Sequence, residues 1–407
     1  MTSAPSTATA LVIFGATYVV VACGRLPGFR LDRAGAALIG ASLMVASGVL
    51  SLGEAYRAVD FDTLVLLLGM MIVVVNLRLS GFFALVANFV ARRVRHPLTL
   101  LVAVVAVSGF FSAFLVNDTI CLVLTPLILA LLKTLRRKPE PYLLAIAMAS
   151  NIGSTATITG NPQNMMIGSF SAIPYGSFLA ALAPVALLGL IVVCALIAAT
   201  YRGEFFGAPR LAAAPIRVRA NLPLVRKSVL VTAASVVAFF FVTPPAKVAI
   251  VAGALLLLTR RVKPERVYAD IDWSLLLLFA GLFIVVAGME KAVFSPDILA
   301  LADRIRLGDV AVLSLVAAVL SNLVSNVPAV LVLKPFIQPL ADPRTAWLTL
   351  AMSATLAGNF TILGSVANLI VVEKARQARA PIGFWRYFRL GAPVTVVTIA
   401  MGIAWLS

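Results

Sequence analysis

Apolar segments long enough to cross a lipid bilayer recur along the whole chain, and they limit its fold more than any other feature. A membrane-crossing backbone must satisfy its own hydrogen bonds, so runs of about 20 apolar residues are typical of transmembrane helices. Hydrophobic residues make up 61% of the chain and charged residues 12%. We therefore predict an all-α polytopic protein of the cell (inner) membrane, whose first apolar run, residues 10–23, is a helix and not a signal peptide.

The basic residues that give a net charge of +17 lie mostly in short loops between apolar runs. Positively charged loops remain in the cytoplasm, so this charge predicts topology and no nucleic-acid partner. The three cysteines and one histidine are too scattered to form a metal site by local spacing. We expect no metal, no cofactor and no enzymatic cluster, and any ATPase subunit would be a separate chain.

Residues 98–132 lie between two strongly basic loops, 91–97 and 133–141, so both ends of this segment are predicted to be cytoplasmic. The middle of the segment reads Asn117, Asp118, Thr119. We therefore predict a re-entrant helical hairpin with a polar tip, surrounded by protein or by a water-filled cavity. The alternative is two ordinary spans joined by a polar loop at the far surface.

The chain also repeats itself in three segments that occur in the same order. "DFDTLVLLLGMMIVVV" aligns with "DWSLLLLFAGLFIVVA", "SAFLVNDTICLVLTPLI" with "SNLVSNVPAVLVLKPFI", and "STATITGNPQN" with "GNFTILGSVAN". Loop charges predict that the halves are inverted, as in many secondary transporters, with about 10 transmembrane helices plus two hairpins. The predicted units are a first repeat at 1–205, a cytoplasmic linker at 206–227 and a second repeat at 228–407, the second hairpin being 309–340.

Two further segments, 142–170 and 346–373, contain glycine, proline and small polar residues at their centres. These residues disfavour a continuous helix, so we predict two discontinuous helices near the membrane midplane, whose free ends bind solutes. The alternative role of the polar residues is close helix packing. The candidate substrate-binding residues from tips and breaks are Asn117, Thr119, Asn151, Thr155, Asn161, Asn164, Ser325, Asn326, Asn359, Thr361, Ser365 and Asn368.

Asp118 has no acidic counterpart in the second repeat, where Val327 takes its place. An acidic residue inside a membrane segment is a functional candidate, and burial favours the protonated form of a carboxyl group. Asp118 is therefore the predicted carrier of a coupling proton. The alternative is an ionised residue that caps its own hairpin helix.

The segments "NDTICLVLTPLI", "SNIGSTATITGNPQN", "SNVPAVLVLKP" and "GNFTILGSVANLIV" resemble the ion transporter superfamily, most of all its arsenite–antimonite permeases. The resemblance spans nearly the whole chain. It implies inverted repeats, substrate bound between hairpin tips and helix breaks, and a homodimer. The related divalent anion/sodium symporters tend to carry Ser-Asn-Thr at each tip, and neither tip here does.

The expected function is therefore export of arsenite and antimonite by proton antiport, through an elevator or rocking form of alternating access. Arsenite is largely an uncharged trihydroxide at neutral pH, which suits a site of Asn, Ser and Thr. Cys121, one helical turn past the first tip, is a possible additional neighbour. Sodium- or proton-coupled symport of carboxylates or inorganic anions, and sodium/proton antiport, are the open alternatives.

Overall fold

The structure, a computed structural model, describes residues 7–24, 28, 30–206, 211, 220–293 and 304–407. These residues form 20 α-helices and two short 3₁₀ helices, and the described part contains no strand. The first half contains α1 (Thr7–Cys23), α2 (Arg33–Ala46), α3 (Leu52–Ala58), α4 (Phe61–Ser80), α5 (Phe82–Arg93), α6 (Pro97–Phe114), α7 (Asn117–Thr134), α8 (Glu140–Ser154), η1 (Ile158–Gly160), α9 (Pro162–Ser171), α10 (Tyr175–Thr200) and α11 (Arg202–Phe205).

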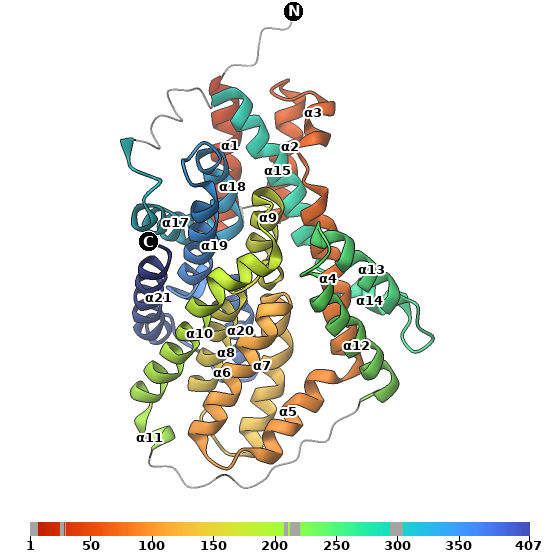
Figure 1. The fold of residues 1–407 in the computed structure, drawn as a ribbon, viewed down its shortest axis with the longest axis vertical. Coiled ribbons are helices and arrows are strands. Elements are labelled where there is room, and N and C mark those ends of the chain that lie inside the picture. Colours follow the sequence, from red (N-terminus) through yellow and green to blue (C-terminus); the bar gives the residue numbers. More distant parts are fainter. Residues whose placement is uncertain (1–6, 25–27, 29, 207–210, 212–219, 294–303) are drawn as a thin grey trace, which may run out of the picture.

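The second half follows the same order, as the ribbon in Figure 1 allows the reader to trace. Its helices are α12 (Leu222–Ala238), α13 (Pro245–Leu257), α14 (Pro264–Ala269), α15 (Trp273–Val293), α17 (Val310–Val324), α18 (Asn326–Ile337), α19 (Pro343–Ala357), η2 (Ile362–Gly364), α20 (Val366–Gln377) and α21 (Phe384–Leu406). The fold class predicted from the sequence, an all-helical polytopic membrane protein, is confirmed.

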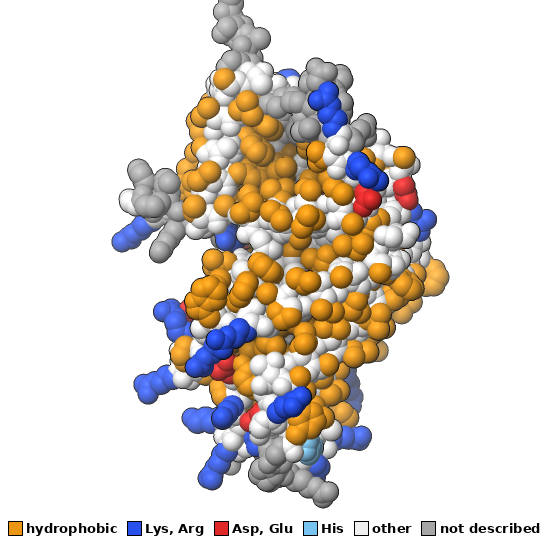
Figure 2. Space-filling model, turned by 90° about the vertical axis from the view of Figure 1, so that its left-hand side faces the viewer, with side chains coloured by type: hydrophobic (Ala, Val, Ile, Leu, Met, Phe, Trp, Pro, Cys, Tyr) orange, Lys and Arg blue, Asp and Glu red, His pale blue; other side chains and the backbone are white. Residues whose placement is uncertain are grey.

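Six helices in the described residues are long and apolar enough to cross a membrane, namely α4, α6, α7, α10, α15 and α21. Five shorter apolar helices accompany them: α1, α2, α13, α17 and α18. Figure 2 shows the result on one face, where hydrophobic side chains cover the upper and middle parts and Lys and Arg side chains gather mainly below. The surface is thus suited to a bilayer with a basic cytoplasmic side.

The two halves exchange their packing partners. Helix α4 of the first half packs against α13 of the second, and α15 of the second half packs against α2 of the first. Within each half, the first hairpin arm packs against the broken helix, α6 on α8 and α17 on α19. Matching elements therefore make matching contacts, and α4 and α15 each complete the opposite half.

The helix breaks are stabilised by one asparagine each. Asn164 Nδ2 donates to the carbonyl oxygens of Ser154 at 3.1 Å and Thr157 at 2.9 Å. In the second break, Asn368 Nδ2 donates to the carbonyl oxygens of Gly358 at 2.7 Å and Thr361 at 3.0 Å. These carbonyls follow the end of a helix and lack intrahelical partners, so the amide supplies the hydrogen bonds that the unwound backbone needs.

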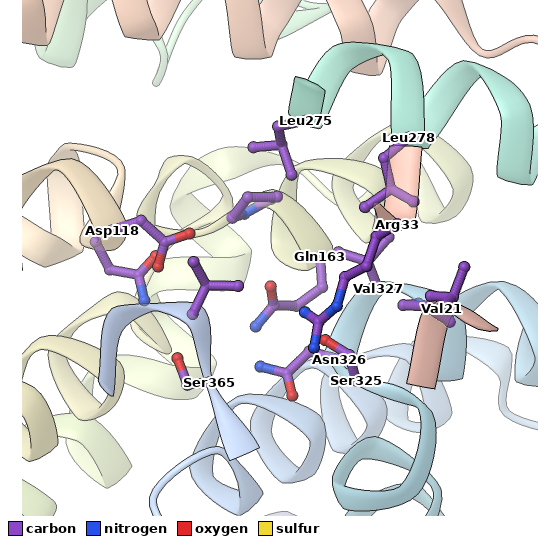
Figure 3. A pocket seen from close by; sticks show the side chains of 14 residues that line it. Val21, Arg33, Asp118, Gln163, Leu275, Leu278, Ser325, Asn326, Val327 and Ser365 are labelled. Atoms are coloured by element: carbon purple, nitrogen blue, oxygen red, sulfur yellow. The ribbon is translucent and has the colours of Figure 1, made fainter. Parts of the chain in front are cut away.

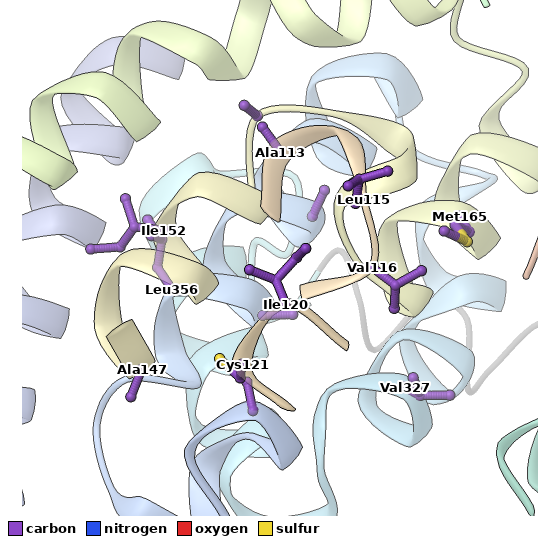
Figure 4. Close-up of a cluster of buried hydrophobic side chains, with 14 of the residues drawn as sticks. Ala113, Leu115, Val116, Ile120, Cys121, Ala147, Ile152, Met165, Val327 and Leu356 are labelled. Atoms are coloured by element: carbon purple, nitrogen blue, oxygen red, sulfur yellow. The ribbon is translucent and has the colours of Figure 1, made fainter. Parts of the chain in front are cut away.

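The tip of the first hairpin lies inside the protein. Asn117 is 4% exposed, and the neighbouring Leu115 and Val116 are buried among side chains of the breaks. Figure 4 shows this apolar cluster, in which Ile120 and Cys121 of α7 approach Ile152 and Leu356. A polar loop at the far surface would be exposed, so the burial favours the re-entrant arrangement.

The end of the linker expected at 206–227 overlaps the first helix of the second half, because α12 begins at Leu222. Residues 207–210 and 212–219 of that linker lie outside the described residues. The charge of Lys334, on α18, is compensated locally by a carboxylate and an aromatic face: its Nζ lies 3.6 Å from Glu290 Oε1 and 4.9 Å from the centre of the Phe170 ring.

Candidate functional site

A cluster of buried amides joins the tip of the first hairpin to both helix breaks, with Asn151 at its centre. Asn151 Nδ2 donates to Asn359 Oδ1 at 2.9 Å and to Asn368 Oδ1 at 3.1 Å. Asn151 Oδ1 accepts from Asn117 Nδ2 at 3.1 Å and from Ser365 Oγ at 3.0 Å. One side chain of α8 thus links the first hairpin tip to the break of the opposite repeat.

Above this cluster lies a cavity of about 50 Å³ between the tips and the breaks, shown in Figure 3. Its polar lining combines side chains from both tips and both breaks with one arginine from α2. The lining residues are Val21, Arg33, Asn117, Asp118, Pro162, Gln163, Leu275, Leu278, Ser325, Asn326, Val327, Pro328, Ser365 and Val366. Five of the predicted site residues therefore reach one space: Asn117, Asp118, Ser325, Asn326 and Ser365.

Two acceptors of the first tip are available to a solute. Asn117 Oδ1 is buried and has no hydrogen-bond partner within the described structure. Asp118 is half-buried at the cavity wall. Helix α7 itself begins without a side-chain cap from Val116.

The second tip is more tightly bound to its surroundings. Ser325 has a φ angle of 79°, which is uncommon for a residue with a side chain and often occurs at ligand sites. With its amide nitrogen toward the carbonyl of Gly364, Asn326 accepts from Gln163 Nε2 at 3.1 Å. Gln163 also donates to Thr355 Oγ1 at 3.2 Å, so it bridges the two repeats.

The structure places the remaining predicted residues beside the cavity or away from it. Asn151, Asn359 and Asn368 form the buried amide cluster under the cavity. Asn161 caps α9 by accepting from the backbone N–H of Asn164 at 2.8 Å. Thr155 donates to the carbonyl of Asn151 in its own helix. The residues that do not line the cavity are Thr119, Asn151, Thr155, Asn161, Asn164, Asn359, Thr361 and Asn368, and Cys121 is also buried away from it.

Sequence reasoning missed two polar residues of the lining. By loop charge, Arg33 belongs to a cytoplasmic basic loop, whereas in the structure it is the first residue of α2 and its side chain extends toward Gln163 and Asn326 in Figure 3. Gln163 belongs to the motif "GNPQN", from which sequence reasoning selects only the asparagines. A signal for Gln163 was therefore present in the motif, and none was present for Arg33. Among the described residues no cluster of His, Cys, Asp or Glu suits a metal ion.

Comparison with known proteins adds three findings. The family model described as "Citrate transporter" (CitMHS) matches residues 10–357. "Uncharacterized transporter Rv2684" of Mycobacterium tuberculosis is 31% identical, covering 98% of this chain and 97% of the relative. "Silicon efflux transporter LSI3" of Oryza sativa is 30% identical, covering 99% and 98%. The solved structure of the Alcanivorax borkumensis YdaH transporter, described as having an unusual topology, superposes with a TM-score of 0.62 at 16% identity over 98% and 96% of the two chains.

Proposed function

The chain belongs to the CitMHS citrate transporter family and is a multi-pass membrane transporter, and on this premise we propose that it exports small uncharged inorganic hydroxides, arsenite and antimonite first among them. Export is coupled to inward proton movement, across the cytoplasmic (inner) membrane. The substrate occupies the cavity between the hairpin tips and the helix breaks. The size and lining of that cavity carry the proposal.

The cavity measures about 50 Å³. An enclosed water needs about 10–15 Å³ of such space, so there is room for roughly three to five water-sized atoms. Arsenite trihydroxide has four non-hydrogen atoms and silicic acid has five, whereas citrate has thirteen. The size therefore favours a small hydroxide, in keeping with the silicon efflux for which the Oryza relative is named.

The chemistry of the lining supports the same class of solute. Asn117 Oδ1 is a buried acceptor without a partner, and the Asp118 carboxylate lies next to it in the chain. A solute hydroxyl can donate to each of them, while the amides of Gln163 and Asn326 can exchange hydrogen bonds with its other oxygens. Satisfying an unpaired buried acceptor is worth about 1–3 kcal/mol, so hydroxyl donors on the solute stabilise the complex.

Asp118 couples the solute to the proton in this proposal. As a carboxylate it accepts a hydrogen bond from the bound hydroxide; as a carboxylic acid it loses part of that acceptor capacity, and the solute is released. Proton and solute thus compete for one group, which antiport requires. Movement of the hairpins and breaks against the remaining helices, as an elevator or by rocking, would then alternate access.

Arsenite uptake into everted vesicles containing the protein tests the proposal. With an acidic interior, wild type should accumulate arsenite, and Asp118→Asn should reduce the gradient-driven rate about a hundredfold or to background, because the amide cannot carry the proton. Asp62→Asn provides the matched control, since Asp62 is exposed in the first turn of α4. Accumulation by Asp118→Asn equal to that of wild type would exclude Asp118 as the proton carrier.

A second candidate is the import of carboxylates or inorganic anions. The description of the family and the presence of Arg33 in the cavity favour it, because a guanidinium binds carboxylates and oxyanions well. Uptake of labelled citrate, succinate or sulfate into right-side-out vesicles, driven by sodium or by protons, would establish this candidate. Absence of both arsenite and silicic acid accumulation under every imposed gradient would exclude the first.

A further inference from the structure

The cavity is closed by two groups of helices with different contents. Asp118, Gln163, Ser325, Asn326 and Ser365 come from the hairpins and breaks. The opposite wall comes from α1, α2 and α15, which pack against one another. That wall contributes three apolar side chains and one charge, namely Val21, Leu275, Leu278 and Arg33.

Arg33 stands out on this wall because it forms no ion pair with any of the described residues. Within the described ranges, no carboxylate lies at ion-pair distance from its guanidinium, and no hydrogen bond from its side chain is formed. The neighbouring Asp32 caps the backbone N–H of Gly35 at 2.8 Å and is exposed. A half-buried guanidinium with five donors and no protein acceptor is arranged to bind an acceptor from elsewhere.

We propose that Arg33 is a specificity-determining residue of the transport site, which holds an oxygen atom of the solute from the α1–α2–α15 wall while the hairpin tips hold its hydroxyls. The inference rests on the proposed function and identifies how that site selects its substrate. The solute must present oxygen acceptors to Arg33 and hydroxyl donors to Asn117 and Asp118. Inorganic hydroxides and protonated oxyanions meet both conditions, and metal cations meet neither.

The placement of Arg33 has a mechanical consequence. Every other polar residue of the lining belongs to the hairpins and breaks, whereas Arg33 belongs to the opposite wall. A solute bound to both groups therefore links them. Loss of Arg33 should weaken solute binding and leave the amide cluster around Asn151 unchanged, since none of the hydrogen bonds of that cluster involves Arg33.

The test compares Arg33→Gln, Arg33→Lys and the control Arg30→Gln in proteoliposomes. Arg30 lies in the same segment, is exposed and does not line the cavity. Because a charge-assisted hydrogen bond is lost, Arg33→Gln should raise the KM for arsenite at least about tenfold. Arg33→Lys should lie between Arg33→Gln and wild type, since it keeps the charge but not the planar fork. Arg30→Gln should match wild type, and all variants should keep the wild-type Tm within about 2 °C in the absence of solute.

The outcomes separate this inference from the proposed function. If wild type transports arsenite and Arg33→Gln does so with an unchanged KM, the role of Arg33 is wrong and the function stands. If wild type transports neither arsenite nor silicic acid, the proposed function is wrong. Thermal stabilisation by citrate, sulfate or phosphate then tests the role of Arg33. Stabilisation of wild type that is lost in Arg33→Gln alone supports that role. Stabilisation that Arg33→Gln retains, or the failure of all three solutes to stabilise wild type, overturns it.

Discussion

In the first helix break Asn164 binds the carbonyls of Ser154 and Thr157, and in the second Asn368 binds those of Gly358 and Thr361. The same side chain thus bridges the same relative positions of each unwound segment. The reactive groups at the cavity do not follow this rule. Asp118 is matched by Val327, and the gapless alignment of Asp60 with Asp272 places Pro245 opposite Arg33.

The comparison indicates that the backbone of the breaks and the chemistry of the cavity are under different constraints. An unwound segment leaves carbonyls without partners in either repeat, so both repeats need an amide at the same place. A transported solute needs one proton carrier and one set of partners, so a second copy of Asp118 or Arg33 would place like charges in one small cavity. Each repeat therefore contains the asparagine that stabilises its helix break, whereas Asp118 and Arg33 each occur in one repeat only.

The largest expected effect concerns Asn151, whose counterpart at the same place in the second break is Thr355. Asn151→Ala should lower the free energy of unfolding by about 3 kcal/mol or more, because buried atoms of Asn359, Asn368 and Asn117 lose their partner. Thermal denaturation in detergent measures this change, together with arsenite transport, which should be lost.

Asn76→Ala is the matched control for that substitution. Asn76 is also buried, but it donates only to the carbonyl of Ile72 in its own helix, at 2.9 Å. Its replacement should cost less than about 1 kcal/mol. Equal losses of stability in the two variants would show that the amide cluster contributes no more than a single intrahelical hydrogen bond.

A medium effect is expected where the hairpin arm meets the broken helix. A Cβ atom at Gly153 would overlap the backbone of Gly109 in α6, whereas the second repeat has alanine at the equivalent position, Ala357. Gly153→Ala should therefore destabilise the protein by about 1–3 kcal/mol through forced separation of α6 and α8.

The reverse exchange, Ala357→Gly, should cost only about 1 kcal/mol, because it adds backbone freedom near a helix end without a clash. Tm values of the two variants, measured side by side, check the asymmetry. If Gly153→Ala is the milder of the two, the closer approach of α6 and α8 does not exist in solution.

The smallest expected effect concerns the first turns of the short helices α3 and α14, because only α3 begins with a side-chain cap. Glu54 completes a capping box with Ser51 at the start of α3, and Lys291 Nζ lies 2.6 Å from its carboxylate. The hydrogen bonds from Lys291 and Ser51 lower the pKa of Glu54 from 4.5 to about 2. Helix α14 begins with Pro264 and has no side-chain cap.

Because the pKa of Glu54 is lowered on folding, its stabilisation is present above about pH 4.5 and disappears as the pH falls toward about 2. Glu54→Gln should lower Tm slightly at neutral pH, since the pair is exposed, and the difference from wild type should shrink from pH 5 to pH 3. Glu265→Gln in α14 is the control. A difference that grows on acidification would contradict the sign of this linkage.

Much of the fold could be predicted from local sequence. The spacing of apolar runs indicates the spans, and the clusters of Gly, Pro and Asn at 150–164 and 358–368 indicate the breaks, because these residues oppose continuous helix wherever they occur. Asn117 and Asp118 at the middle of an apolar segment likewise indicate a protected tip. These patterns involve residues that are close together in the sequence, so they can be recognised without knowledge of the tertiary structure.

Which of the candidate residues line the cavity and which stabilise the helix breaks could not be predicted in the same way. Asn164 and Asn368 carry the same residue type as Asn117 and Asn326, and only the three-dimensional contacts show that the first two bind backbone carbonyls. Arg33 lies far from every motif in the sequence, and its positive charge is as typical of a cytoplasmic loop as of a binding site. Its place depends on how α2 packs against α1 and α15, which no local pattern encodes.

The exchange of partners between the halves, α4 on α13 and α15 on α2, bears on how the protein is made. The ribosome synthesises α2 and α4 well before α13 and α15, so neither early helix can pack against its partner from the second half until that half has been made. Membrane insertion of α2 and α4 must therefore precede their packing against α15 and α13. Until then, close-packing surfaces such as that of Gly69, which meets the backbone of Ala249 in the folded protein, are exposed to lipid and can bind chaperones or pack against incorrect helices.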